Sequence, residues 1–213
     1  MPSAPFILDN TRLLAPPLVP EVRLHLAEES LPIWRKTEEE LGELNVPPPY
    51  WAFAWAGGQA LARYVLDNRA LVAGRSVLDL GSGSGLSAIA ARLAGAAQVV
   101  AADIDALALA AIGLNARANG VDVAVRGDNV LTAPPEPFEV LLVGDLFYER
   151  ALAEAVLGYA RSARALGAEV LVGDPRRSYF PKLVFEEVAT YAVPVTRELE
   201  DAEIKHTAVW RLA

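Results

Sequence analysis

The most informative stretch of this 213-residue sequence is Val77-Leu-Asp79-Leu-Gly81-Ser-Gly83-Ser-Gly85. It reads as a short buried strand that breaks into a glycine-rich turn, and the residues after it have the apolar spacing of a helix. Glycines in such a turn let the backbone approach a ligand closely, and the start of the helix offers unpaired N–H donors. The stretch therefore predicts a strand–turn–helix unit that binds a ligand.

The spacing of these glycines separates three kinds of ligand. A phosphate-binding P-loop would end in Gly-Lys-Ser/Thr, whereas Gly85 is followed by Leu86 and Ser87. A nicotinamide or flavin site would have glycine at position 86. Asp79 stands two residues before Gly81, and a carboxylate there would repel a pyrophosphate but could receive the cationic amino-acid end of a sulfonium cofactor. The alternative role of Asp79 is to cap the turn.

Four further polar residues lie at or after the ends of predicted strands at the same edge. Asp103 ends the second strand, close to the spacing at which an acid accepts hydrogen bonds from ribose hydroxyls. Asp105 is expected to be the N-cap of the next helix. Asp128 and Asn129 follow the third strand, where Asp128 could accept from an adenine amino group; local turn chemistry is the alternative.

Strands and helices alternate from about residue 74 onward. Strands are predicted at 76–80, 98–102, 121–125, 138–143 and 169–173, helices at 86–94, 106–119, 151–166 and near 180–188, and a final hairpin at 189–195 and 204–211 with a charged turn at 197–201. Alternation of this kind implies parallel pairing with right-handed crossovers. We therefore expect an α/β fold: a doubly wound, Rossmann-like, mostly parallel seven-strand sheet that ends in an antiparallel C-terminal hairpin.

The first part of the chain is expected to pack on this domain as a short extension. We assign residues 1–70 to the extension and 71–213 to the main domain. Within the extension we expect a strand in 18–27, an acidic helix at 32–44 that prolines end, and a helix at 58–68.

Composition narrows the class of protein. The chain has no cysteine and only two histidines, so disulfides and cysteine metal sites are excluded, no metal is expected, and the cytoplasm is the default location. Its net charge of −8 disfavours a nucleic-acid partner and suits a basic protein surface. No apolar run is long enough to span a membrane, and the N-terminus lacks the features of a secretory signal.

The glycine loop, the acid after the second strand and the terminal hairpin together resemble the class I, seven-strand S-adenosylmethionine (SAM)-dependent methyltransferases. More narrowly, the aromatic segment Pro49-Tyr-Trp-Ala-Phe-Ala-Trp55 and its continuation to Tyr64 are similar to the electron-transfer flavoprotein β-subunit lysine methyltransferases, whose relatives modify ribosomal-protein lysines. The resemblance covers roughly residues 20–212. It implies SAM as the cofactor and a protein lysine as the methyl acceptor.

The resemblance also implies roles for particular residues. Trp55 and Gly58 would line the methionine end of the cofactor, although Trp55 could instead belong to the core. Asp145-Leu-Phe-Tyr148 matches the D-x-x-Y/F motif that follows strand four. Methyltransferases that act on planar nitrogens carry two prolines inside this motif, so the Leu146-Phe147 pair favours a flexible amine such as lysine.

These residues suggest a mechanism at the acceptor side. Asp145 would attract and orient the incoming ammonium as a catalytic residue with Tyr148, and Phe147 and Tyr148 would form an aromatic pocket for the lysine side chain. Arg176 and Arg177, after the fifth strand, either touch an acidic part of the protein substrate or belong to a solvated turn. A small-molecule methyltransferase and a SAM-binding module without turnover remain as alternative functions.

Overall fold

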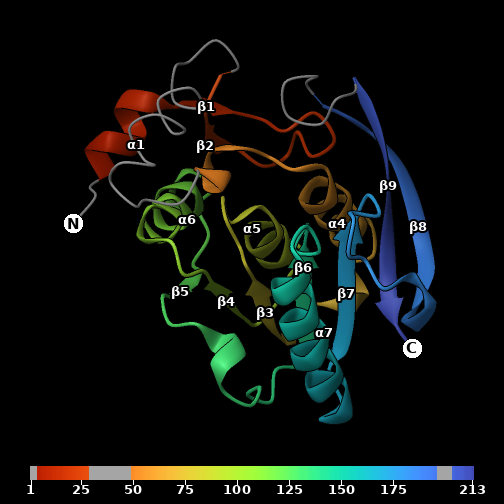
Figure 1. Cartoon of the computed structure of the whole chain (residues 1–213). Coiled ribbons are helices and arrows are strands. Elements are labelled where there is room, and N and C mark those ends of the chain that lie inside the picture. Colours follow the sequence, from red (N-terminus) through yellow and green to blue (C-terminus); the bar gives the residue numbers. More distant parts are fainter. Residues whose placement is uncertain (1–3, 29–48, 196–202) are drawn as a thin grey trace.

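The expected mostly parallel seven-strand sheet is confirmed by the computed structural model, which describes residues 4–28, 49–195 and 203–213. The strand order is β5-β4-β3-β6-β7-β9-β8, with β8 and β9 at one side of the sheet and β4 and β5 toward the other (Figure 1). The strands span β3 Ser76–Leu80, β4 Gln98–Ala102, β5 Ala124–Arg126, β6 Val140–Gly144, β7 Glu169–Asp174, β8 Phe185–Pro194 and β9 Ile204–Leu212.

The direction of the strands sets where a ligand can bind. Strands β3 to β7 are parallel, and β9 runs antiparallel to both β7 and β8. The chain proceeds from β3 outward to β4 and β5, and then returns to place β6 on the other side of β3. This reversal opens a crevice at the carboxyl ends of β3 and β6, the place where open α/β sheets bind ligands.

Helices cover both faces of the sheet. They are α1 Ala4–Asn10, α4 Ala56–Asp67, α5 Leu86–Leu93, α6 Ala106–Ala118 and α7 Arg150–Ala165, with single 3-10 turns η2 Tyr50–Ala52, η3 Arg69–Leu71, η4 Val130–Thr132 and η5 Lys182–Val184. Neighbouring strand residues belong to different cores: Val77 packs with α4 and α5, whereas Leu78 packs with α7. Burial on both faces explains why these strands are almost continuously apolar.

One predicted helix is wrong. The segment near 180–188 forms only the short turn η5 and then enters β8 at Phe185. Phe180 stacks on Phe185 and lies 4.8 Å from the Trp210 ring, and Phe147 packs edge-on to Phe180. These rings cover the α7 side of the sheet near β9 in place of a helix.

Other boundaries moved by a few residues. The third strand of the domain is β5 at 124–126 rather than 121–125. The predicted helix at 32–44 and the turn at 197–201 lie outside the described residues.

The N-terminal segment is tied to the domain by two asparagines of α6. The strand predicted in 18–27 is β2, Leu24–Leu26, which pairs antiparallel with β1, Arg12–Leu14. Asn115 accepts from the His25 backbone and donates to the Ser84 carbonyl of the glycine loop, and Asn119 bonds the Arg23 backbone. The division at residue 70 stays a prediction, while α4, which lies before it, contributes to the same core as the sheet.

Candidate active site

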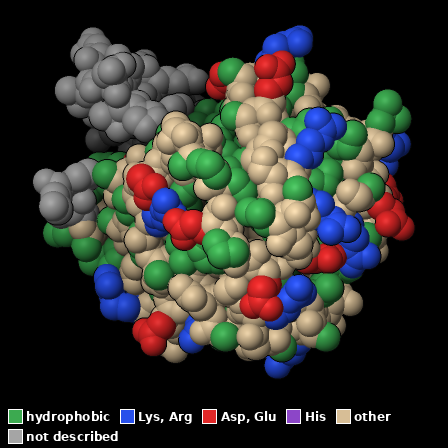
Figure 2. Space-filling model, turned by 90° about the horizontal axis from the view of Figure 1, so that it is seen from below, with side chains coloured by type: hydrophobic (Ala, Val, Ile, Leu, Met, Phe, Trp, Pro, Cys, Tyr) green, Lys and Arg blue, Asp and Glu red, His purple; other side chains and the backbone are tan. Residues whose placement is uncertain are grey.

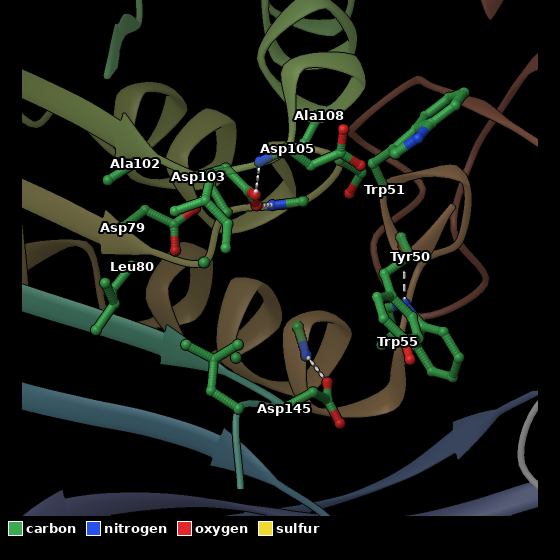
Figure 3. Close-up of a pocket in the computed structure, with 18 of the residues that line it drawn as sticks. Tyr50, Trp51, Trp55, Asp79, Leu80, Ala102, Asp103, Asp105, Ala108 and Asp145 are labelled. Carbon is green, nitrogen blue, oxygen red and sulfur yellow. Dashed lines mark hydrogen bonds between the residues drawn. The ribbon is translucent and has the colours of Figure 1, made fainter. Parts of the chain in front are cut away.

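A cavity of about 520 Å³ opens at the carboxyl ends of β3, β4 and β6. In Figure 3 Asp79 and Asp103 lie across it from Tyr50 and Trp55. Of the residues singled out from the sequence, the structure brings eleven to its lining: Trp55, Gly58, Asp79, Gly81, Gly83, Asp103, Asp128, Asn129, Asp145, Tyr148 and Arg177. The residues expected to bind cofactor and most of those expected to serve the acceptor therefore share one cavity.

Asp79 is a buried acid within the glycine loop. Its side chain is 2% exposed, and Oδ2 accepts from Ser82 Oγ at 2.5 Å and from the Ala88 N–H at 3.1 Å. Burial raises its pKa to about 7. Gly81 has a φ of 63° beside the Leu146 side chain, so a Cβ there would be both strained and 2.7 Å from that side chain.

Asp103 links the glycine loop to the start of α6. Its Oδ2 accepts from the Gly83 N–H at 2.8 Å, and its Oδ1 accepts from the Asp105 N–H at 3.0 Å. Asp105 in turn accepts from the Leu107 N–H at 2.8 Å, which confirms the predicted N-cap. The carboxylate of Asp103 is thus fixed at the cavity wall, where the ribose was expected.

Asp128 and Asn129 line the cavity while making local bonds. Asp128 is paired with Arg126 through Nε and Nη2 at 2.6 and 2.8 Å, and this hydrogen bonding lowers the pKa of Asp128. Asn129 accepts from the Leu131 N–H at the start of η4. The Asn129 bond is a turn interaction of the kind that the sequence left open beside adenine recognition, whereas Asp128 forms an ion pair with Arg126. The adenine role stays a prediction.

The N-terminus of α4 forms the far side of the cavity. Trp55 precedes the helix and donates from Nε1 to the Tyr50 carbonyl at 2.9 Å. Helix and sheet meet there through two glycines: a Cβ on Gly57 would lie 2.2 Å from the Gly173 oxygen, and one on Gly173 would lie 2.0 Å from the Gly57 oxygen. Sequence analysis missed this pair, since nothing local marks two glycines that meet from distant segments.

Asp145 has both carboxylate oxygens engaged. Oδ2 accepts from the Gly58 N–H at 2.9 Å, while Oδ1 accepts from Arg177 Nε at 2.9 Å and pairs with Nη2 at 2.6 Å. Arg177 also lies over the Trp55 ring, 5.6 Å from its centre. An ammonium approaching Asp145 would therefore meet a carboxylate that already has a cationic partner.

A second buried acid, Asp174, supports Arg177 from β7. It is fully buried, and its Oδ1 accepts from the Arg177 N–H at 2.7 Å, whereas Oδ2 has no hydrogen-bond partner. Burial and the nearby charge of Asp145 raise the pKa of Asp174 to about 7. Apart from its place at the end of a predicted strand, this acid has no local signal in the sequence.

Tyr148 lies at the cavity mouth with an aromatic neighbour that sequence analysis did not identify. Its ring is 44% exposed and 5.8 Å from that of Tyr50, which also lines the cavity. Partial burial raises the pKa of the Tyr148 phenol. The exposed ring pair forms one side of the opening.

Two predicted acceptor residues lie elsewhere. Phe147 is fully buried in the core on the α7 side of the sheet and does not line the cavity, because its ring packs against Phe180 and Phe185. Arg176 pairs with Glu187 and lies over the Trp210 ring, outside the cavity lining. The structure thus separates Arg177, at the cavity, from its neighbour.

No group of three or more His, Cys, Asp or Glu in residues 4–28, 49–195 and 203–213 is arranged to hold a metal ion. No helix in the same part of the chain has the length and apolar character needed to cross a membrane.

Comparison with solved structures gives the fold. A putative RNA methyltransferase from Pyrococcus horikoshii superposes with a TM-score of 0.59 over 84% of this chain and 98% of that one, at 16% identity. Magnesium protoporphyrin IX methyltransferase from Synechocystis, with bound SAM, gives a TM-score of 0.54 over 73% of this chain and 78% of that one, at 15% identity. Both likenesses place the chain among proteins with the methyltransferase fold.

Sequence comparison gives the family. Residues 59–142 match the model of ribosomal protein L11 methyltransferase (PrmA). Electron transfer flavoprotein beta subunit lysine methyltransferase from Danio rerio is 38% identical over 97% of this chain and 81% of its own length. The proteins of the same name from Xenopus laevis and Homo sapiens are 38% and 34% identical, each over 96% of this chain and over 85% and 80% of their own lengths. The chain is a methyltransferase and belongs to the electron transfer flavoprotein beta subunit lysine methyltransferase family.

Proposed function

We propose that this enzyme transfers a methyl group from SAM to lysine in the β-subunit of electron-transfer flavoprotein. The observation that carries the proposal is the identity with the curated lysine methyltransferases, which extends over 96–97% of the chain and so includes both ends of the cavity. The names of those relatives supply the substrate.

The residues of the glycine loop fit the chemical groups of SAM. Both hydrogen bonds to Asp79 use Oδ2, so Oδ1 can receive the cationic amino group, and the raised pKa of this acid would fall when a cation binds beside it. Asp103 would accept from the ribose hydroxyls, Asp128 and Asn129 would meet the adenine, and Trp55 and Gly58 would flank the methionine end.

At the acceptor end the chain's own residues align the amine. SAM supplies a methyl group on a sulfonium that leaves readily, so the protein's main task is positioning, which can contribute about 7–11 kcal/mol. The lysine nitrogen donates its lone pair to the methyl carbon while the carbon–sulfur bond breaks toward sulfur. Tyr148 and Tyr50 would contact the lysine methylenes, and Asp145 would orient the amine as a catalytic residue.

The electrostatics favour a protein partner over a nucleic acid. Besides the net charge of −8, basic side chains lie beside acidic ones on the face drawn in Figure 2 instead of forming a basic stripe. The cytoplasmic location stays a prediction from the sequence.

Mass spectrometry of purified electron-transfer flavoprotein, after incubation with enzyme and SAM, tests the proposal. We expect the β-subunit to gain the mass of one or more methyl groups on lysine, and expect a much smaller gain with the Asp79→Asn variant at the same limiting SAM concentration. A β-subunit that stays unmodified while another protein in a lysate is labelled would contradict the choice of substrate.

Ribosomal protein L11 is the second candidate, because residues 59–142 match that methyltransferase family. The match covers the glycine loop and the first four strands of the sheet, so it favours shared cofactor chemistry more than a shared substrate. The same assay with L11 in place of the flavoprotein decides between them.

A further inference from the structure

We propose that the Arg177 guanidinium keeps the acceptor lysine in its neutral, nucleophilic form. In this view Arg177 is a positioning residue that neutralises the negative charge of Asp145 at the acceptor end of the cavity. The inference rests on the proposed function and revises one part of it, since Asp145 then does not attract an ammonium.

The groups at the acceptor end that could bind a cation already contact Arg177. Asp79 and Asp103 lie on the opposite side of the cavity (Figure 3), which leaves Asp145, Arg177 and the tyrosine pair for the incoming lysine. The Asp145 carboxylate and the face of Trp55 are the two groups there that best bind a cation. Both already contact the Arg177 guanidinium, at 2.6 Å from Asp145 Oδ1 and 5.6 Å from the Trp55 ring centre.

Backbone hydrogen bonds hold Arg177 in place. The Arg177 N–H donates to Asp174 Oδ1 at 2.7 Å, and the Asp145 N–H donates to the Gly173 carbonyl at 3.0 Å. Asp145 and Arg176 both have a positive φ, 58° and 67°, a conformation that side chains rarely adopt and that tends to mark functional sites. The guanidinium is therefore preorganised rather than a mobile surface charge.

Several acidic and titratable groups surround the Arg177 guanidinium. Asp145 is one anion facing it, and Asp174 is a second acid that burial keeps partly protonated near neutral pH. Tyr148 faces Arg177 from the loop before α7, with Tyr50, Glu149 and Asp103 as its other charged or titratable neighbours. With Asp145 and Arg177 cancelling each other, the carboxylate that would contact the incoming amine does not contribute an unbalanced negative charge that would stabilise an ammonium.

The chemistry requires such a neutral environment. A free lysine has a pKa of about 10.4 and is mostly protonated at neutral pH, and an ammonium has no lone pair to attack the methyl carbon. Loss of water favours the neutral amine, and a carboxylate that is already neutralised by Arg177 does not oppose this effect. The lysine would lose its proton to solvent on entry and then form the new nitrogen–carbon bond.

The test is the pH dependence of methylation of the flavoprotein by wild-type enzyme and five variants. In Arg177→Gln the unpaired Asp145 carboxylate stabilises the ammonium, so we expect kcat at neutral pH to fall about tenfold or more, KM for the protein substrate not to rise, and the rise of kcat with pH to move about one unit or more toward alkaline pH. Arg177→Lys keeps the charge and should keep the wild-type position of the rise.

A double variant guards against misfolding. Because Arg177→Gln leaves a buried carboxylate without its partner and can fail to fold, Arg177→Gln combined with Asp145→Asn replaces the pair by two neutral side chains. We expect it to fold and to show an alkaline shift smaller than that of Arg177→Gln alone. Asp174→Asn identifies any part of the profile near pH 7 that belongs to Asp174.

Arg150→Gln is the matched control. Arg150 is an exposed arginine at the start of α7, lies over the Tyr179 ring and does not line the cavity. Its loss removes the same charge and should leave the pH profile in place.

Two kinds of failure are distinguishable. If wild-type enzyme does not methylate the flavoprotein at any pH, the proposed function fails. If wild-type enzyme is active and Arg177→Gln loses activity equally at all pH values, or if the double variant shows an alkaline shift as large as that of Arg177→Gln, the inference is overturned.

Discussion

The two ends of the cavity are built in different ways. At the cofactor end the hydrogen bonds of Asp79 and Asp103 close within the chain over 3, 9 and 20 residues. At the acceptor end Asp145 meets Gly58 across 87 residues and Arg177 across 32. A local motif therefore carries most of the cofactor end, whereas the acceptor end exists only once α4, β6 and β7 have packed together.

The largest effect is expected where those three elements meet. In Gly57→Ala the new methyl would lie 2.2 Å from the Gly173 oxygen and 2.5 Å from Asp145 Oδ2, so α4 must move away from the sheet. Overpacking of this kind costs about 1–3 kcal/mol or more. We expect a lower free energy of unfolding in urea, together with methylation reduced far more than SAM binding.

Gly158→Ala is the control for that variant. Gly158 lies exposed on α7 with open space around its missing Cβ, and alanine there should raise stability by about 0.5–1 kcal/mol. If Gly57→Ala proved equally harmless, the close contact of α4 with β7 would not be needed to build the acceptor end.

An intermediate effect is expected at the cofactor end. Asp79→Asn removes the charge that would meet the cationic amino group, and loss of such a charged hydrogen bond should weaken S-adenosylhomocysteine binding by roughly ten- to hundredfold. Methylation and cofactor binding should fall together, unlike in the acceptor-end variants. Isothermal titration calorimetry measures the affinity.

The pH dependence of that binding tests the same acid. Since the pKa of Asp79 is about 7 without ligand and should be lower beside a bound cation, binding releases a proton below neutral pH. Affinity should therefore increase as pH rises to about 7 and level off above it, with about a tenfold deficit one unit below. Wild-type affinity that is flat from about pH 6 to 8 would contradict the contact between Asp79 and the amino group.

The smallest effect is expected from the cap of α6. Asp105→Ala removes the acceptor for the Leu107 N–H and should cost about 1 kcal/mol of stability, whereas Asp105→Asn should keep the cap. Thermal unfolding distinguishes the two. Equal losses in both variants would mean that the charge of Asp105, not its capping bond, is what the fold uses.

The sequence predicts the locally built cofactor end better than the acceptor end, which distant segments build. The strands at 76–80 and 98–102, the loop after Leu80 and the cap at Asp105 were all predicted as they occur, because short-range hydrogen bonds and apolar periodicity set them. Phe147 was misassigned since its motif position says nothing about the rings of Phe180 and Phe185 that bury it.

The parts that were missed depend on contacts between distant segments. Gly57 and Gly173 carry no local sign that they touch, and Tyr50 reaches Tyr148 only through the fold. The partner of Asp145 was likewise hidden, as Arg177 was considered only for the substrate or for solvent. Pairing across the chain, rather than residue type, decides these roles.

The left-handed backbone at Asp145 has a consequence for redesign. Position 145 must tolerate a φ of 58° and also carry the carboxylate that binds Arg177 and Gly58. Asparagine and glycine tolerate this backbone conformation but have no carboxylate, so neither meets both demands. Tyr50 and Tyr148 bear no such double demand. An engineer who wants a different acceptor should vary the two rings and leave the acid alone.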